Sequence, residues 1–274
     1  MNGQPLVVGY GSAGKRHVRA LVTRGYTPCT VDINDEVEAT FSDLEDALHE
    51  KWSFAIIATP PEYHVEQMKA FLDMNIPVLC EKPVAGFGQM DILKELTTHK
   101  NANQVLVSYN YRYNPDIDLT KVAYHYSGLL AKQSPIAEVS LFASQKRDLP
   151  YWGIILDHLS HDVNLLQSLF GEMSIETARH ITTDSKTMCI AHGVFLNGIP
   201  FTIKDEARKN PSERIARIQV NGYTFHMTPN ARMFDRMYDC FFAMLNGDFT
   251  GPTSLDDAIK TQEVLEEIKR LASA

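Results

Sequence analysis

Pro5-Leu-Val-Val-Gly9-Tyr-Gly11-Ser-Ala-Gly14 is the stretch that decides the fold of this chain. A short apolar strand enters a Gly-x-Gly-x-x-Gly pattern, and a helical stretch follows it. In such a unit the first glycine permits the tight turn, the second lets a pyrophosphate approach the backbone, and the third lets helix and strand pack closely. The helix N-terminus then faces the phosphates with its partial positive charge. We therefore predict a dinucleotide site at Gly9, Gly11, Ser12, Ala13 and Gly14.

An acidic residue indicates which dinucleotide is bound. The second predicted strand covers residues 28–33, and Asp32 lies near its end, within about 20 residues of the last glycine. A carboxylate at this position can accept hydrogen bonds from both ribose hydroxyls of adenosine and repels a 2′-phosphate. The sequence therefore favours NAD over NADP. The alternative interpretation is a glycine-rich turn beside a solvent-exposed aspartate.

Alternating strands and helices follow the glycine motif. Further apolar strands at 54–59, 76–80 and 104–109 are separated by helical stretches at 62–74 and 86–100. This order predicts a parallel, doubly wound sheet that binds its ligand at the carboxyl ends of the strands. Near-continuous apolar strands fit burial on both faces of such a sheet.

The pattern changes after about Tyr113, where half-exposed strands predominate. The predicted strands cover 137–143, 188–195, 199–203, 214–220 and 224–227, and the predicted helices cover 155–170, 232–246 and 254–272. The predicted fold class is therefore α/β, with an N-terminal Rossmann domain at residues 1–112. An α+β domain with a mostly antiparallel, open sheet is predicted at residues 113–274.

Composition excludes several classes of partner. The 274 residues are 44% hydrophobic and 22% charged, which is ordinary for a globular protein. A net charge of -8 argues against a nucleic acid as partner. The chain has no apolar run of about 18 residues and no signal-peptide pattern, and its four scattered cysteines suggest no disulfide framework. We expect a cytoplasmic protein that binds neither nucleic acid nor membrane.

Two loops at the predicted carboxyl edge carry candidate residues. Thr59 and Pro60 follow the third strand, in a stiff loop that is expected beneath the nicotinamide ribose, and His64 stands near the helix that follows. Glu81 and Lys82 follow the 76–80 strand. The lysine can donate to a substrate oxygen and stabilise an alkoxide, with Glu81 orienting it. A surface salt bridge before a turn is the alternative.

The predicted helix at 155–170 supplies an acid–imidazole pair. At 100° per residue, Asp157 and His161 lie about 40° apart, and the apolar residues Leu156, Leu159, Val163, Leu166 and Phe170 lie on the opposite side. Asp157 can hold the imidazole of His161 in one tautomer, which suits a general base. Two alternatives are a solvated surface pair and a metal site that includes His158 and Asp162. No matching ligand cluster elsewhere in the sequence supports a metal site.

Further residues are predicted to contact the substrate. If the segment after the fifth strand stays extended, Asn110 and Arg112 share one side of it, and Arg112 is expected to contact a polar or anionic group. An ordinary interdomain salt bridge is the alternative role for Arg112. Tyr151 and Trp152 can stack on a sugar ring or base. His158, on the flank of the helix, is a further candidate.

Five motifs in this order resemble the glucose-fructose oxidoreductase / inositol dehydrogenase / MocA (Gfo/Idh/MocA) family. They are Gly9–Gly14, Thr59-Pro60, Glu81-Lys82-Pro83, Asn110–Tyr113 and Asp157–His161. The resemblance covers nearly the whole chain and identifies a short member, trimmed after Asp32 and after His161. It implies that Lys82 and His161 are catalytic, with Asp157 supporting. It also implies hydride transfer between NAD(P) and a hydroxyl carbon of a sugar, inositol or nucleotide-sugar, and a homodimer formed through the C-terminal sheet.

Two other functions on the same fold are compatible with these motifs. One is a regulatory protein that binds NAD and a sugar without chemistry, and such a protein is expected to lose the lysine or the histidine. Lys82 and His161 are both present, which favours an enzyme. The other is a hidden-redox lyase or glycosidase, in which NAD oxidises and then re-reduces one substrate carbon.

Overall fold

The computed structural model describes residues 3–115, 139–146, 153–208, 215–220, 223–226, 231–247 and 251–274. The chain divides into two compact units. One consists of Met1–Ser108 together with Asp235–Ile259, and the other of Tyr109–Phe234 together with Lys260–Ala274. The first unit therefore includes a segment that returns from near the C-terminus.

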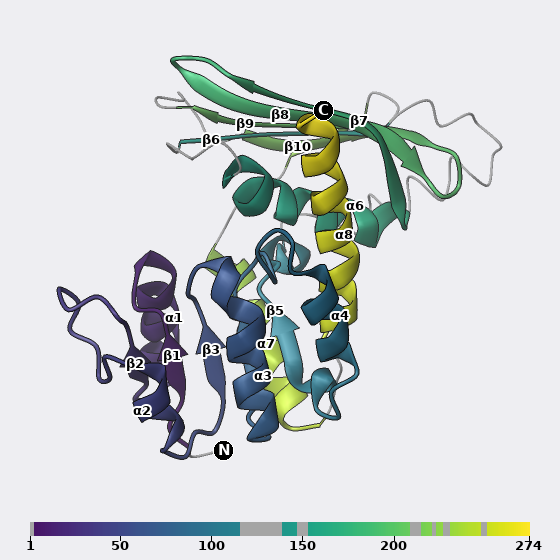
Figure 1. Cartoon of the computed structure of the whole chain (residues 1–274). Helices are drawn as coiled ribbons and strands as arrows, with labels where there is room; N and C mark the ends of the chain where they lie inside the picture. Colours follow the sequence, from purple (N-terminus) through teal and green to yellow (C-terminus); the bar gives the residue numbers. More distant parts are fainter. Residues whose placement is uncertain are drawn as a thin grey trace. The chain divides into compact units, whose positions relative to one another are not determined.

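Five short parallel strands form the sheet of the first unit (Figure 1). In the order β2-β1-β3-β4-β5 they are Cys29–Val31, Leu6–Val8, Ala55–Ile57, Val78–Cys80 and Val105–Val107. Every residue of β1, β3, β4 and β5 is buried, as expected for a parallel sheet covered on both faces. β1 pairs with β2 on one side and β3 on the other. The carboxyl ends of β1 and β3 therefore border the topological switch point, where such sheets bind ligands.

Helices connect these strands and carry apolar side chains toward the sheet. They are α1 (Ser12–Thr23), α2 (Leu44–Leu48), α3 (His64–Asp73) and α4 (Met90–Thr97), with short 3-10 turns η1 (Pro61–Tyr63) and η2 (Ala102–Gln104). The buried side of α1 consists of Gly14, His17 and Leu21. A histidine on this otherwise apolar stripe marks a polar contact inside the unit.

Helix α7 (Ala231–Leu245) belongs largely to the returning segment and packs through aromatic side chains. Phe241 meets Phe54 edge-on, with ring centroids 5.4 Å apart, and Phe242 stacks on Tyr26 at 5.4 Å. Tyr238 is fully buried. The aromatic residues of α7 therefore complete the hydrophobic core of the first unit.

A six-stranded sheet forms the second unit, in the order β11-β10-β6-β9-β8-β7 (Figure 1). In that order the strands are Tyr223–His226, Ile215–Val220, Val139–Lys146, Pro200–Arg208, Lys186–Phe195 and Met173–Thr182. All neighbouring strands are antiparallel except β6 and β9. Among the described residues, the helical elements of the second unit are η3 (Asn110–Tyr113), the π-helix η4 (Ile154–Leu159), α6 (Ser160–Phe170) and most of α8 (Leu255–Ala272).

The structure confirms the predicted fold class, a doubly wound parallel sheet followed by a mostly antiparallel α+β domain. The two C-terminal helices also match their predictions, and Ser254 accepts a hydrogen bond from the backbone N–H of Asp257 (3.3 Å) at the start of α8. Strand β7 was not predicted. Its register shifts between Ile175 and Thr177, so alternation of buried and exposed residues is interrupted. In the described part of the chain, no helix has the length and apolar character needed to cross a bilayer.

Candidate active site

The three glycines of the β1–α1 loop have different surroundings. Gly9 has a φ of 87°, and a Cβ atom there would lie 2.6 Å from the carbonyl oxygen of Ala58. A Cβ at Gly14 would overlap the carbonyl oxygen of Gly9. At Gly11, no atom of the described residues lies within 4 Å of the corresponding position. Backbone packing therefore requires Gly9 and Gly14, whereas Gly11 leaves open space beside the helix.

Gly11 is also the N-cap of α1, and Ser12 and Ala13 begin the helix. Within the described ranges no side chain caps this helix, and its first turn contains no acidic residue. The N–H groups of the first helical turn lack intrahelical acceptors, and the helix dipole favours negative charge at this end. The loop therefore has the geometry and polarity that a bound diphosphate needs.

Asp32 is fixed beside this loop. Its Oδ2 accepts a hydrogen bond from the backbone N–H of Tyr10 (2.7 Å), and its Oδ1 accepts one from the backbone N–H of Asn34 (2.9 Å). The aspartate directly follows β2 and is half-buried. The carboxylate predicted to select NAD is therefore held at the end of β2, next to the glycine loop.

His64 connects the two loops that carry candidate residues at the carboxyl edge of the sheet. The imidazole is fully buried, with Nε2 2.8 Å from the carbonyl oxygen of Thr59 and Nδ1 2.9 Å from that of Pro83. Burial lowers the pKa of His64, although both carbonyl contacts and the charge of Glu81 oppose that shift. His64 therefore has a structural role, because it holds the backbone at Thr59 and at Pro83 in place. Thr59 also donates from Oγ1 to Oε1 of Gln67 (2.7 Å).

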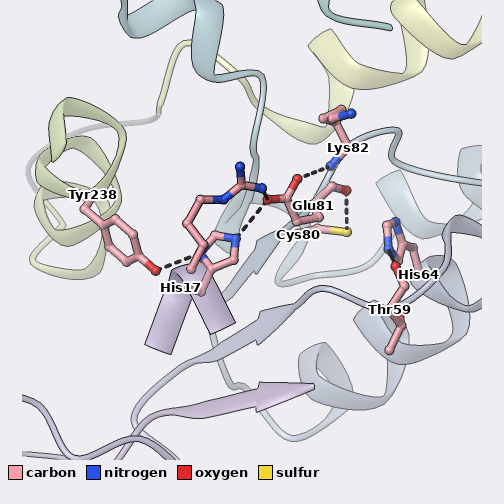
Figure 2. Close-up of polar contacts among 8 residues, drawn as sticks. His17, Thr59, His64, Cys80, Glu81, Lys82 and Tyr238 are labelled. Carbon is pink, nitrogen blue, oxygen red and sulfur yellow. Dashed lines mark hydrogen bonds and ion pairs between the residues drawn. The ribbon is translucent and has the colours of Figure 1, made fainter. Parts of the chain in front are cut away.

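Glu81 lies at the carboxyl end of β4 and is buried among polar partners (Figure 2). Its Oε1 is 3.0 Å from Nε2 of His17 and 3.8 Å from Nη2 of Arg16. Its Oε2 accepts a hydrogen bond from the backbone N–H of Lys82 (3.2 Å). The Lys82–Pro83 peptide bond is cis, and Lys82 is half-buried.

Electrostatics keep Glu81 ionised. Burial by itself would raise the pKa of this carboxyl, but the hydrogen bond from His17 and the charges of His17, Lys82 and Arg16 outweigh it and lower the pKa to about 2. The neighbouring thiol of Cys80 is buried beside that negative charge, and both effects raise its pKa well above the usual value. A thiolate nucleophile at Cys80 is therefore not available at neutral pH.

Sequence reasoning missed two members of this group. Nδ1 of His17 lies 2.8 Å from the hydroxyl of Tyr238, so α1 and α7 are joined through the histidine that contacts Glu81. His17 could have been found as the polar residue on the buried stripe of α1. Tyr238 carried no local signal, because its partner lies 221 positions earlier in the chain.

The segment containing Asn110 and Arg112 is a 3-10 helix, so the prediction based on strand alternation is wrong in its geometry. Backbone hydrogen bonds run from Arg112 N–H to Tyr109 O (3.0 Å) and from Asn114 N–H to Tyr111 O (3.2 Å). Nη1 of Arg112 donates to Oδ1 of Asn164 (3.3 Å) within the second unit. Asn110 and Arg112 are both half-buried, and their roles toward a substrate remain predictions.

The predicted helix at 155–170 begins as a π-helix, so the assumed 100° per residue does not apply to Asp157. Oδ2 of Asp157 lies 3.8 Å from Nε2 of His158. Nδ1 of His158 lies 3.3 Å from Oδ1 of the fully buried Asp205. His158 is itself buried and is held between two carboxylates. The substrate contact predicted for His158, and the orienting role of Asp157 toward His161, remain predictions.

His161 lies in the first turn of α6 and is half-buried among tyrosines. Its ring stacks on Tyr111 with centroids 4.6 Å apart and an interplanar angle of 20°, and it meets Tyr109 edge-on at 6.4 Å. The face of α6 that carries His161 is largely buried. Asn164 on that face is buried and donates from Nδ2 to Oγ1 of Thr261 (3.0 Å).

Two of the predicted substrate residues, Tyr151 and Trp152, lie outside the described residues. Within the described ranges, no group of three or more histidine, cysteine, aspartate or glutamate side chains is arranged to hold a metal ion. Lys82 belongs to the first unit, and His161 and Asp157 belong to the second.

Comparison with known families identifies the N-terminal region. Residues 4–111 match the model of the Gfo/Idh/MocA family, described as an oxidoreductase family with an NAD-binding Rossmann fold. This part of the chain is similar to the NAD-binding Rossmann domain of that family. The match spans the glycine loop, Asp32, the Thr59 loop and the Glu81-Lys82-Pro83 turn. The sequence matches no curated protein sequence.

Solved structures of dehydrogenases share the fold over nearly the whole chain. A myo-inositol dehydrogenase from Corynebacterium glutamicum has a TM-score of 0.79 at 13% identity, covering 100% of this chain and 97% of that one. The WlbA dehydrogenase from Bordetella pertussis, in complex with NADH and UDP-GlcNAcA, has a TM-score of 0.78 at 18% identity with the same coverage. WlbA from Thermus thermophilus, in complex with NAD and UDP-GlcNAcA, has 0.72 at 20%, covering 97% and 94%.

Proposed function

We propose that this protein is an NAD-dependent oxidoreductase that transfers a hydride between nicotinamide and a hydroxyl carbon of a sugar, inositol or nucleotide-sugar. The observation that carries the proposal is the glycine loop with the adjacent carboxylate of Asp32, both at the carboxyl edge of the parallel sheet. The open space at Gly11 and the tethered carboxylate of Asp32 fit a diphosphate and an adenosine ribose. Lys82 stands at the same edge, after β4.

Different residues of the first unit would bind different parts of NAD. The first-turn N–H groups of α1, at Ser12 and Ala13, are suited to the diphosphate, and Asp32 is suited to the ribose hydroxyls. Thr59 and Pro60, held by His64, would support the nicotinamide half. When bound, NAD supplies the hydride acceptor of the reaction. The negative charge of Asp32 favours NAD over NADP.

Three side chains would manage the proton and the charge. His161 removes the proton from the substrate hydroxyl while the C–H electron pair leaves as hydride, so that a carbonyl forms. The Lys82 ammonium donates to the same oxygen and stabilises its developing negative charge. Asp157 orients the imidazole of His161. Asn110, Arg112, Tyr151, Trp152 and His158 are proposed to bind the substrate.

Two findings support a sugar-like substrate. The WlbA neighbours were solved with UDP-GlcNAcA, and another neighbour is a myo-inositol dehydrogenase. His161 lies against two tyrosine rings, and aromatic surfaces of this kind suit the apolar faces of sugar rings. The nucleotide-sugar alternative also gives Arg112 a natural partner in a substrate phosphate or carboxylate.

The test is to add NAD and a panel of inositols, free sugars and UDP-sugars, while nicotinamide absorbance and product formation are followed together. Accumulation of NADH with loss of one substrate class is the expected result. Product formation without NADH accumulation would indicate the hidden-redox alternative. Tight NAD and sugar binding without any product would indicate a regulatory protein. Failure to bind NAD at all would overturn the proposal.

A further inference from the structure

A buried chain of hydrogen bonds leads from α7 to the turn that carries Lys82. Figure 2 shows the hydroxyl of Tyr238 directed at His17, and His17 directed at the carboxylate of Glu81. The two distances are 2.8 Å and 3.0 Å. Tyr238 and His17 are fully buried, and the Glu81 side chain is 9% exposed. All of these residues belong to the first unit.

The ionised carboxylate of Glu81 fixes the direction of the hydrogen bond at one end of this chain. An ionised carboxylate accepts hydrogen bonds only, so Nε2 of His17 carries the hydrogen that faces Glu81. Nδ1 of His17 lies 2.8 Å from the Tyr238 hydroxyl, which can accept from a ring N–H at Nδ1 or donate to Nδ1 when that atom carries no hydrogen. In either arrangement each polar atom in these contacts has a hydrogen-bonding partner.

These hydrogen bonds restrain the backbone of Lys82, the residue that follows Glu81. Oε1 of Glu81 accepts a hydrogen bond from His17 and lies within ion-pair distance of Arg16. Oε2 of Glu81 accepts a hydrogen bond from the backbone N–H of Lys82. His64 holds the far side of the same turn through the carbonyl oxygen of Pro83. The backbone on both sides of the Lys82 side chain is therefore tied to a buried histidine, directly or through Glu81.

We propose that Tyr238 and His17 are positioning residues for Lys82: they fix the Glu81 carboxylate, and through it the turn that presents the lysine to the substrate. The returning helix α7 thereby becomes part of the site, although none of its residues needs to touch the substrate. This proposal rests on the proposed function for the catalytic role of Lys82. The geometry of the turn itself does not depend on that role.

The test measures the reactivity of Lys82 directly, by competitive labelling with acetic anhydride and mass spectrometry, with the exposed Lys69 as internal reference. Tyr238→Phe removes one hydroxyl from the chain, and Tyr26→Phe is the matched control because Tyr26 also packs on α7, against Phe242. Loss of one hydrogen bond between neutral groups changes the equilibrium between the ordered and the loosened turn by about fivefold. Lys82 should therefore label at least about threefold faster in Tyr238→Phe, because a looser turn exposes the amine, and at the unaltered rate in Tyr26→Phe.

Rescue separates positioning from general stability. Gln at position 17 can still donate to Glu81 and accept from Tyr238, whereas Leu can do neither. His17→Gln should stay close to the unaltered labelling rate, and His17→Leu should match or exceed Tyr238→Phe. With a known substrate, Tyr238→Phe should lower kcat and leave the KM for NAD unchanged. Unchanged Lys82 labelling in folded Tyr238→Phe and His17→Leu would overturn the positioning proposal. If the unaltered protein turns over none of the sugars, inositols and UDP-sugars, the proposed function fails. The labelling of Lys82 still shows whether the hydrogen bonds from Tyr238 and His17 position the turn.

Discussion

Nε2 of His17 lies 3.0 Å from Oε1 of Glu81, so the first helix after the glycine loop holds the acidic residue that precedes Lys82. These two residues are separated by 64 positions in sequence. The glycine loop that precedes α1 and the turn at Glu81 both follow strands at the carboxyl edge of the sheet. The nucleotide loop and the lysine turn are therefore parts of one buried polar structure. Several measurable properties depend on it.

The first prediction concerns acid stability. The pKa of Glu81 is lowered from 4.5 to about 2, so its contribution to stability is complete above pH 4.5 and is lost as the pH falls toward 2. A shift of this size corresponds to roughly 3 kcal/mol at neutral pH. Glu81→Gln should flatten the fall of the unfolding free energy across that pH window, measured by urea titration followed by circular dichroism.

Glu267 is the matched control for this measurement. Its carboxylate pairs with Arg270 on the surface of α8, where solvent screens the interaction, so Glu267→Gln should change the same curve little. If Glu81→Gln and Glu267→Gln give the same acid profile as the unaltered protein, the assignment of an ionised, buried Glu81 is wrong.

The second prediction separates the glycines. A Cβ at Gly14 overlaps the carbonyl oxygen of Gly9, so Gly14→Ala should destabilise the first unit by more than about 1 kcal/mol. Gly11 has an extended backbone with φ of -74° and open space around it, so Gly11→Ala should leave the melting temperature nearly unchanged. Its methyl group would instead occupy the space proposed for the diphosphate. NAD titration of Gly11→Ala should show clearly weaker binding, and undiminished affinity would argue against a diphosphate at this loop.

The third prediction concerns cofactor choice. Asp32→Asn keeps the size of the side chain and one of the two oxygens that accept from the backbone N–H groups of Tyr10 and Asn34, and it removes the charge that repels a 2′-phosphate. The ratio of NAD to NADP affinity should fall by at least about tenfold, or roughly 1.4 kcal/mol. Asp32→Ser should narrow the preference as well. Equal or tighter NADP binding by the unaltered protein, measured by titration, would refute the role assigned to Asp32.

The fourth prediction concerns Arg112. If it binds an anionic or polar group of the substrate, Arg112→Ala should raise the KM for substrate by about tenfold or more, the range for a charge-assisted hydrogen bond. Asn164→Ala removes the protein partner of Arg112 and serves as the comparison. A purely structural role predicts similar losses of stability in both variants and no change in KM.

Much of the fold was predictable because local patterns and tertiary structure agree. The glycine motif and the apolar triplets of β1, β3, β4 and β5 predicted the parallel sheet, and the helix predicted at 254–272 matches α8. β7 was missed because a bulge breaks its alternation. The side of the 155–170 helix that carries His161 is more buried than its sequence periodicity indicates. The helix begins as a π-helix and packs against η3 and α8, and the periodicity of the helix predicts neither feature.

The same distinction applies to the candidate site. Gly9, Gly11 and Gly14 could be predicted from sequence because they form a recognisable pattern between a strand and a helix, and Asp32 and Lys82 because each follows a recognisable strand. Tyr238 could not, since only the return of α7 to the first unit brings it to His17. Asp157 was placed by an ideal helix that the chain does not form at that point, and its described ion pair is with His158.

The most direct test of the account is the turnover of His161→Asn with an identified substrate, measured together with NAD affinity. His192→Asn is the matched control, because His192 is exposed on β8 and bonds only to Thr202 among the contacts described. General-base catalysis contributes about a hundred- to ten-thousandfold, so His161→Asn should lower kcat by at least roughly a hundredfold, with NAD affinity unchanged. Lys82→Ala should lower kcat similarly. Normal turnover by His161→Asn, or loss of its NAD binding, would contradict the account.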